Sequence, residues 1–320
     1  MAGPYELHNS DVDDRAWSYQ LFSILGCLRR RWEKKRIRSV FKHNLADNVV
    51  ESVGERKRLT VLFSDIFSFT DYLVKQPLEE AYSNLCEYFT EMVDVILRYG
   101  GMIDKFMGDE MMVDFGVPTH FPDHAERACL VALEMVRSFK RLRERWVQEG
   151  KEIFNIKIGI NTGDMIVGNI GSNQIFDYSV IGAAVSLGVR LRDINKVYLT
   201  ANHIIISEFT KNELSDKIVT RELDSVRVKG LNKPMAIFEL VSEKDSIVYP
   251  KEFLLHFTEG LERYKKMEWD WAIKEFSTGL KIKDDEVSSM YIKRCRQYKE
   301  NPPIADWDGV FTLRTSLSFL

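Results

Sequence analysis

Between residues 57 and 240, short β-rich runs alternate with long amphipathic segments, and glycines mark the points of change. The run LTVLFSDI predicts a strand, and the segment from Leu78 to Tyr99, which stops at Gly100 and Gly101, predicts a helix with a glycine C-terminus. The runs MIDKF and EMMVDFG flank a Gly-Asp pair, as the two strands of a hairpin do. The order of strand, helix and hairpin is typical of an α+β fold with one sheet covered by helices.

The second half of this region continues the same alternation. A stripe of apolar residues predicts a helix over 123–148, and FNIKIGINTGD and MIVGNIG predict two strands broken by glycine turns. We expect a further helix over 180–195 and a last strand pair formed by RVKG and MAIFEL.

The chain divides into four predicted parts. We expect an N-terminal helical, linker and dimerisation segment over 1–56, a main domain over 57–243, a helical module over 250–300 and an extended tail over 301–320. The module has the spacing of one tetratricopeptide-like helical hairpin, followed by a third helix over 287–298. The residues that give this spacing are Gly260, Trp269, Ala272, Phe276 and Gly279.

Composition and charge exclude several classes of protein. The 320 residues contain 45 Lys and Arg against 48 Asp and Glu, with a net charge of -3, so a dedicated nucleic-acid binder is not expected. The 4 cysteines stand far apart, which favours a reduced, cytoplasmic chain over a disulfide framework. The acidic start does not resemble a signal peptide, and the apolar stretch 17–28 is too short to cross a membrane.

A basic segment follows that apolar stretch, from Arg29 to Lys42. It could lie on an anionic membrane surface. We favour a dimerising or linker helix that contacts protein, because apolar residues recur at helical spacing through the stretch and into the basic segment, at Leu21, Ile24, Leu25, Leu28 and Trp32.

Two carboxylates are expected to meet at one edge of the sheet. Asp65 ends the first predicted strand, and Asp109 lies in the hairpin turn. Either aspartate alone could serve as a turn or cap residue. As a pair they are hard oxygen ligands suited to Mg²⁺ or Mn²⁺, which could act on a nucleoside triphosphate.

Four separated segments, FSDIFSFT, KFMGDE, GINTGDMIVGNIGS and DYSVIGAAVSLGVRL, together resemble the class III nucleotidyl cyclase catalytic domain over residues 58–241. The resemblance implies a ferredoxin-like antiparallel sheet core covered by helices. It also implies active sites shared between two catalytic domains. Diguanylate cyclases need a contiguous Gly-Gly-Asp/Glu-Glu-Phe turn, which this region lacks.

By that resemblance, Asp65 and Asp109 bind two metal ions, Mg²⁺ or Mn²⁺, with help from the backbone carbonyl of Ile66. Backbone amides of Phe69 and Thr70 would contact the phosphates, and Lys229 would hold the triphosphate. The family's usual glycine before Phe69 is Ser68 here.

The resemblance also assigns the residues that read the base and stabilise the transition state. Lys105 and Ser179 take the base-reading positions, and Arg190 takes that of the transition-state arginine. Adenine N1 accepts a hydrogen bond and its amino group donates one, which matches a lysine donor and a hydroxyl acceptor. Ser186 replaces the family asparagine that orients the ribose, and it offers one donor in place of two.

The sequence therefore predicts a homodimeric adenylyl cyclase that converts ATP to 3',5'-cyclic AMP and pyrophosphate. The alternative is a degenerate cyclase domain that binds nucleotide and regulates a partner without efficient turnover. Ser186 favours the alternative, whereas the metal, base and phosphate residues favour the enzyme. A scaffold that acts through its C-terminal hairpin is a third interpretation.

Overall fold

The computed structural model describes residues 54–172, 176–227, 233–244, 246, 248–304 and 307–312. The predicted N-terminal segment, apart from its last three residues, lies outside the described residues. Lys229 and residues 305–306 and 313–320 of the predicted tail lie outside them as well.

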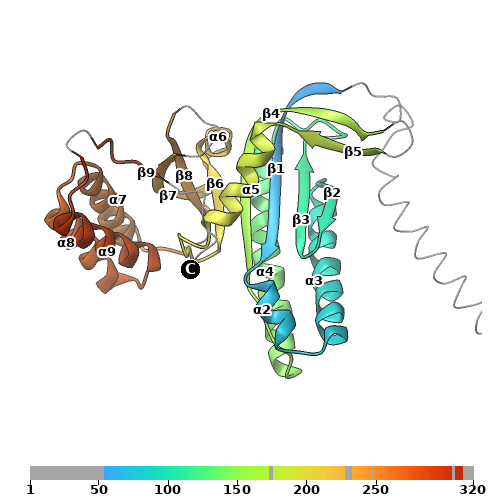
Figure 1. Cartoon of the computed structure of the whole chain (residues 1–320), viewed down its shortest axis with the longest axis horizontal. Helices are drawn as coiled ribbons and strands as arrows, with labels where there is room; N and C mark the ends of the chain where they lie inside the picture. The colour runs from blue at the N-terminus through green and yellow to red at the C-terminus, as the bar shows by residue number, and fades with distance from the viewer. Residues whose placement is uncertain are drawn as a thin grey trace, which may run out of the picture. The chain divides into compact units, whose positions relative to one another are not determined.

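The described strands form one mixed sheet (Figure 1). Its order is β2-β3-β1-β4-β6-β8-β7-β9, with β5 paired to β4. Neighbouring strands are antiparallel except for β4 with β6 and β7 with β9. The strands are β1 (Glu55–Ile66), β2 (Met102–Met107), β3 (Glu110–Phe115), β4 (Ile156–Gly171), β5 (Phe176–Ile181), β6 (Ile204–Ser207), β7 (Ile218–Arg227), β8 (Met235–Glu243) and β9 (Phe311–Thr312).

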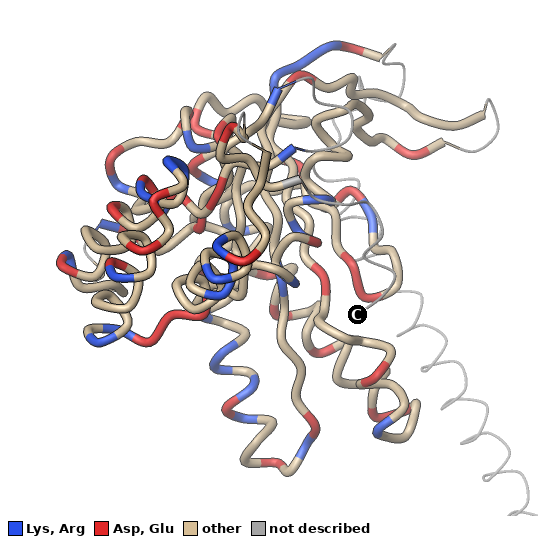
Figure 2. The backbone as a smooth tube through the Cα atoms, turned by 60° about the vertical axis from the view of Figure 1, so that its left-hand side comes forward, with Lys and Arg blue, Asp and Glu red and all other residues tan. Residues whose placement is uncertain are grey.

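The described helices include the predicted ones, in the predicted order, and two short helices that were not predicted, α2 and α6. The described helices are α2 (Phe69–Val74), α3 (Leu78–Arg98), α4 (His124–Gln148), α5 (Ala183–Ile194), α6 (Glu208–Lys211), α7 (Lys251–Lys265), α8 (Trp269–Ile282) and α9 (Glu286–Glu300). Across the described residues, none of these helices has the length and hydropathy that a membrane span requires. Lys and Arg are interspersed with Asp and Glu along the described chain (Figure 2).

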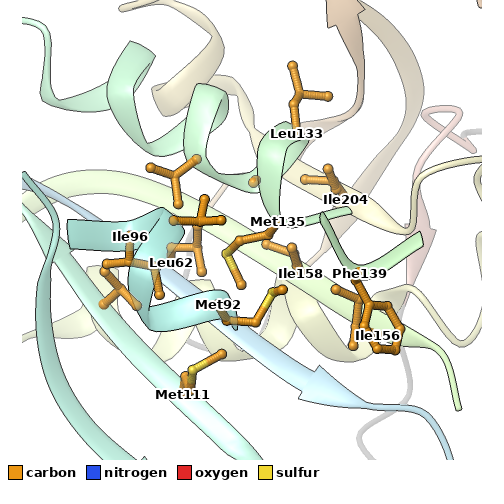
Figure 3. Close-up of a cluster of buried hydrophobic side chains, with 14 of the residues drawn as sticks. Leu62, Met92, Ile96, Met111, Leu133, Met135, Phe139, Ile156, Ile158 and Ile204 are labelled. Atoms are coloured by element: carbon orange, nitrogen blue, oxygen red, sulfur yellow. The ribbon is translucent and has the colours of Figure 1, made fainter. Parts of the chain in front are cut away.

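Helices α3 and α4 cover one face of β1, β3 and β4 and bury the largest apolar cluster against it (Figure 3). Leu62 of β1 points into this cluster, whereas Val61 and Phe63 point to the opposite face, as the two-residue period of a strand requires. The sheet therefore has an apolar core on both faces.

Helix α3 forms because its apolar residues recur every three or four positions, and it ends where its sequence reaches Gly100. Gly100 has a φ of 76°, which is costly for any residue with a Cβ. The amides of Gly100 and Gly101 donate to the carbonyls of Leu97 and Ile96 and so close the last turn. The predicted helix, its glycine stop and the hairpin after it are confirmed.

The prediction of two strands in the segment 154–171 is wrong, because β4 is one continuous strand. Its glycines are not turns. Two of them make room for α5: a Cβ on Gly159 would lie 2.2 Å from the backbone nitrogen of Arg192, and one on Gly163 would lie 2.8 Å from the Cβ of Ala184. Glycine in β4 therefore sets how closely α5 approaches the sheet.

One helix boundary and one whole strand also differ from the sequence prediction. The helix expected from Val180 begins at Ala183, because Val180 and Ile181 pair with β4 as the end of β5. Strand β6, a run of four fully buried residues, was not predicted. Such a short apolar run carries no periodicity that identifies it.

Helices α7, α8 and α9 share one apolar cluster with residues of α5, β6, β7 and β8. Gly260 lets α7 approach α8, since a Cβ there would lie 2.9 Å from the ring of Phe276. The helical hairpin and third helix are present as expected, while their likeness to a tetratricopeptide repeat stays a prediction. Arg221 of β7 pairs with Asp285 before α9 at 3.0 Å, so buried charges also join these helices to the sheet.

Candidate active site

The carboxyl groups of Asp65 and Asp109 lie together at one end of the sheet. Asp65 is the second-last residue of β1, and Asp109 lies in the turn between β2 and β3. The two side chains share a hydrogen bond, and the backbone amide of Ile66 donates to Oδ2 of Asp109 at 3.4 Å. The structure therefore brings together the three residues predicted to bind metal.

Two buried cations face the same carboxylate of Asp65. Lys157 of β4 places Nζ 2.9 Å from Asp65 Oδ2, and Arg192 of α5 places Nη1 3.1 Å from the same oxygen. Arg192 also contacts Glu110 Oε2 at 2.6 Å. Sequence reasoning missed these residues. The one available signal was Lys157 itself, which lies between two apolar residues in the sequence IKI. A lysine buried in a strand needs an acidic partner.

These contacts move the pKa values of the two aspartates in opposite directions. Burial opposes ionisation of Asp65, but its hydrogen bond with Asp109 and the charges of Lys157 and Arg192 outweigh burial and lower its pKa. Burial and the neighbouring Asp65 raise the pKa of Asp109 to about 6. Below about pH 6 the pair thus shares a proton, and above it both carboxylates are ionised and suited to a cation.

The donor set fits a metal that binds substrate phosphates as well as protein. Among the residues that the structure describes, no group of three or more His, Cys, Asp or Glu side chains is placed to hold a metal. Two carboxylates supplemented by backbone and phosphate oxygens suit Mg²⁺ or Mn²⁺ better than a metal that needs a full protein cage.

The predicted phosphate-contacting residues begin α2, directly after β1. Ser68 is the N-cap of this helix and has a φ of 49°, a left-handed conformation that glycine adopts more readily. The serine therefore keeps the backbone turn for which glycine is the usual residue. Phe69 and Thr70 occupy the first turn of α2, close in sequence to Asp65.

The predicted base-reading residues Lys105 and Ser179 meet through a third residue, Asp104. Lys105 Nζ lies 3.1 Å from Asp104 Oδ1, and the hydroxyl of Ser179 donates to Asp104 Oδ2 at 2.5 Å. The Lys105 side chain is 38% exposed, whereas Ser179 is 2% exposed. Lys105 is thus the accessible member of the pair. Sequence reasoning missed Asp104.

Ser186 and Arg190 lie on α5, one turn apart, with Ser186 exposed and Arg190 half-buried. Arg192, two residues after Arg190, faces Asp65. Two residues correspond to about 200° around a helix, so Arg190 is on a different side of α5 from the one that meets Asp65 in the same chain. Lys229, the predicted triphosphate ligand, lies outside the described residues.

A family model and the sequences of known proteins both show that this chain is similar to nucleotide cyclases. The model described as "Adenylate and Guanylate cyclase catalytic domain" matches residues 52–242. "Adenylate cyclase, terminal-differentiation specific" from Dictyostelium discoideum is 30% identical over 252 residues, which cover 75% of this chain and 11% of that protein. "Adenylate cyclase 1" from Rhizobium meliloti is 29% identical over 186 residues, which cover 58% of this chain and 28% of that protein. The chain thus spans less than a third of the length of these two relatives.

Two solved structures resemble the chain to a similar degree. The adenylyl cyclase CyaB from P. aeruginosa is 36% identical with a TM-score of 0.56, covering 61% of this chain and 100% of that one. The guanylyl cyclase Cya2 is 34% identical with a TM-score of 0.55, covering 62% of this chain and 98% of that one. The sheet and its covering helices therefore match the fold of these cyclases. One of the two is named an adenylyl cyclase and the other a guanylyl cyclase, so the names do not agree on the nucleotide base.

Proposed function

Because the chain belongs to the family of adenylate and guanylate cyclase catalytic domains, we propose that it is an adenylyl cyclase. The reaction is attack of the ribose 3'-hydroxyl of ATP on the α-phosphorus, which forms 3',5'-cyclic AMP and releases pyrophosphate. We also propose a cytoplasmic location, because the substrate ATP is present there and the separated cysteines favour a reducing compartment.

The observation that carries this proposal is the paired carboxyl groups of Asp65 and Asp109. Together with the carbonyl of Ile66, they would hold two Mg²⁺ or Mn²⁺ ions. Bound metal supplies activation of the attacking hydroxyl and neutralisation of the pyrophosphate charge. The amides of Phe69 and Thr70 lie one short turn further along the chain, where they can donate to phosphate oxygens.

The choice of ATP rests on Lys105, because the relatives include both adenylyl and guanylyl cyclases. An ammonium group only donates hydrogen bonds, and adenine N1 accepts them, whereas guanine N1 carries a hydrogen. A lysine at this position therefore favours adenine.

The orientation of α5 supports a homodimer with shared sites. Arg190 is on a different side of α5 from Arg192, which contacts Asp65 of the same chain. We propose that Arg190 and Ser186 act on a nucleotide held by the aspartates of a second copy. A two-fold dimer of this kind has two equivalent sites.

Purified protein incubated with ATP or GTP and Mn²⁺ tests the proposal. We expect cyclic AMP from ATP, less product from GTP, and loss of product in Asp109→Asn. Asp177→Asn is the matched control, because Asp177 is an exposed residue of β5. Cyclic GTP as the main product would contradict the choice of base, and unchanged activity of Asp109→Asn would contradict the site.

A second candidate function is nucleotide-dependent regulation of a partner without efficient turnover. The replacement of the usual asparagine by Ser186 favours it, as does the occupation of Asp65 by two cations. Tight binding of ATP by a folded protein that forms no cyclic nucleotide would support this candidate and overturn the enzyme.

A further inference from the structure

Strand β2 contains a bulge at Asp104. Ile103 pairs with Val113 of β3, and Lys105 pairs with the preceding residue Met112, which leaves Asp104 as an extra residue. Ile103 lies in the cluster under α3, and Phe106 contacts Phe89 of α3 with 4.7 Å between ring centroids. The bulge thus turns two consecutive side chains, Asp104 and Lys105, to the face opposite α3.

On that face the carboxylate of Asp104 is fully buried and contacts one side chain of β5 and one of its own strand. Its side chain is 0% exposed. Ser179 of β5 donates to one oxygen at 2.5 Å, and the Lys105 ammonium lies 3.1 Å from the other. Lys105 has the only exposed end among these three side chains.

Asp114 of β3 completes the buried group. Both of its oxygens are buried and, as a carboxylate, it would have no donor among the residues that the structure describes. Burial, followed by the charge of Asp104 and a hydrogen bond to it, raises the pKa of Asp114 well above its usual value. A protonated Asp114 donates to Asp104 and so leaves a single negative charge, on the carboxylate that faces Lys105.

We propose that Asp104 is a positioning residue for base selection, which fixes the Lys105 ammonium against the adenine ring, with Ser179 and Asp114 orienting Asp104 from behind. This inference rests on the proposed use of ATP and changes the role of Ser179. The buried Ser179 hydroxyl acts through Asp104 and Lys105, and the adenine amino group does not contact it.

Binding of two unreactive nucleotides in the presence of Mn²⁺ tests the inference. The first is 3'-deoxyATP, which lacks the attacking hydroxyl. The second is the same molecule without the 6-amino group, which keeps N1 for Lys105. Asp104→Asn removes the charge but retains the shape, and Ser179→Ala removes the donor to Asp104. We expect each variant to weaken both nucleotides by the same factor, about tenfold, because each loosens the same contact to N1.

Four further variants separate the positioning of Lys105 by Asp104 from other effects on nucleotide binding. In a Lys105→Ala background, Asp104→Asn should weaken binding no further, since the residue through which it acts is gone. Asp114→Asn keeps a donor to Asp104 and should bind like wild type, whereas Asp114→Val should resemble Asp104→Asn. The exposed Asp177→Asn on β5 should be neutral.

Several results would overturn the inference. If Ser179→Ala weakened only 3'-deoxyATP, Ser179 would contact the amino group directly. If Asp104→Asn had no effect in a folded protein, or the same effect without Lys105, Asp104 would not position Lys105. Because neither probe can cyclise, a wild-type protein that binds both but forms no cyclic AMP contradicts the proposed function alone. One that binds neither overturns both.

Discussion

Arg192 Nη1 lies 3.1 Å from Asp65 Oδ2, an ion pair between α5 and the end of β1 in one chain. The pair fixes which side of α5 faces the predicted metal ligands. Arg190 therefore presents a different side of the helix, although only one residue separates it from Arg192. We therefore propose that a single chain contributes the metal-binding half of one site and the transition-state half of another.

Ser186 is an exposed position where an amide should improve the enzyme. We expect Ser186→Asn to raise kcat by about 10- to 100-fold and to change KM less, because the added donor acts mainly in the transition state. Steady-state kinetics with ATP measure this. A lower kcat in the variant would show that the site is adapted to serine.

Lys105 should determine base preference. We expect Lys105→Glu to reduce kcat/KM for ATP far more than for GTP, because a carboxylate would face the acceptor N1 of adenine. Parallel measurements with the two nucleotides check this. An equal loss for both would mean that Lys105 does not contact the base.

The pKa of Asp109 should give the metal-free protein a characteristic pH dependence. This pKa rises from an ordinary value of 3.8 to about 6 on folding, so the native state binds the proton more tightly than the unfolded chain does. The resulting stabilisation is complete below pH 3.8 and is lost as the pH rises through 6.

Asp109→Asn has no such proton. Its free energy of unfolding relative to wild type should therefore increase between pH 4 and pH 7, as measured by urea unfolding without metal. A difference that stays constant with pH would contradict the shifted pKa.

Asp285 should be needed for stability. Its carboxylate pairs with buried Arg221 at 3.0 Å and accepts a hydrogen bond from the Ser288 amide at 2.8 Å as the N-cap of α9. We expect Asp285→Ala to lower the free energy of unfolding by about 2–3 kcal/mol, because α9 loses its N-cap and buried Arg221 keeps only Glu239, 2.7 Å away, as a carboxylate partner. The adjacent exposed Asp284→Ala is the control. Equal unfolding midpoints for both variants would refute this account.

The same contacts predict the effect of ending the chain after Glu243. Arg221 would lose Asp285, and Asp224 would lose Arg294, which lies 2.6 Å away. We expect the shortened protein to be much less stable, with Mn²⁺-dependent turnover in the fraction that folds. A folded and dimeric but inactive product would instead show that α7–α9 take part in catalysis.

The sequence was sufficient for features that depend on neighbouring residues. The strand ending at Asp65, the helix that stops at Gly100 and the turn at Asp109 follow from local periodicity and glycine, so the carboxylate pair could be predicted. Lys157 and Arg192 could not, because their partners depend on how closely α5 approaches Gly159. Asp104 was missed because a bulge changes the side-chain alternation without a glycine or proline to mark it.

The most direct test of the shared site is activity in mixed dimers. Asp65→Ala and Arg190→Ala should each be nearly inactive, and mixing them should restore part of the cyclic AMP production, because one of the two sites in the mixed dimer keeps every residue. Asp65→Ala mixed with Asp109→Ala is the matched control and should stay inactive, since each of its sites lacks an aspartate. No recovery in the first mixture, with mixed dimers demonstrated, would contradict a site built from two chains.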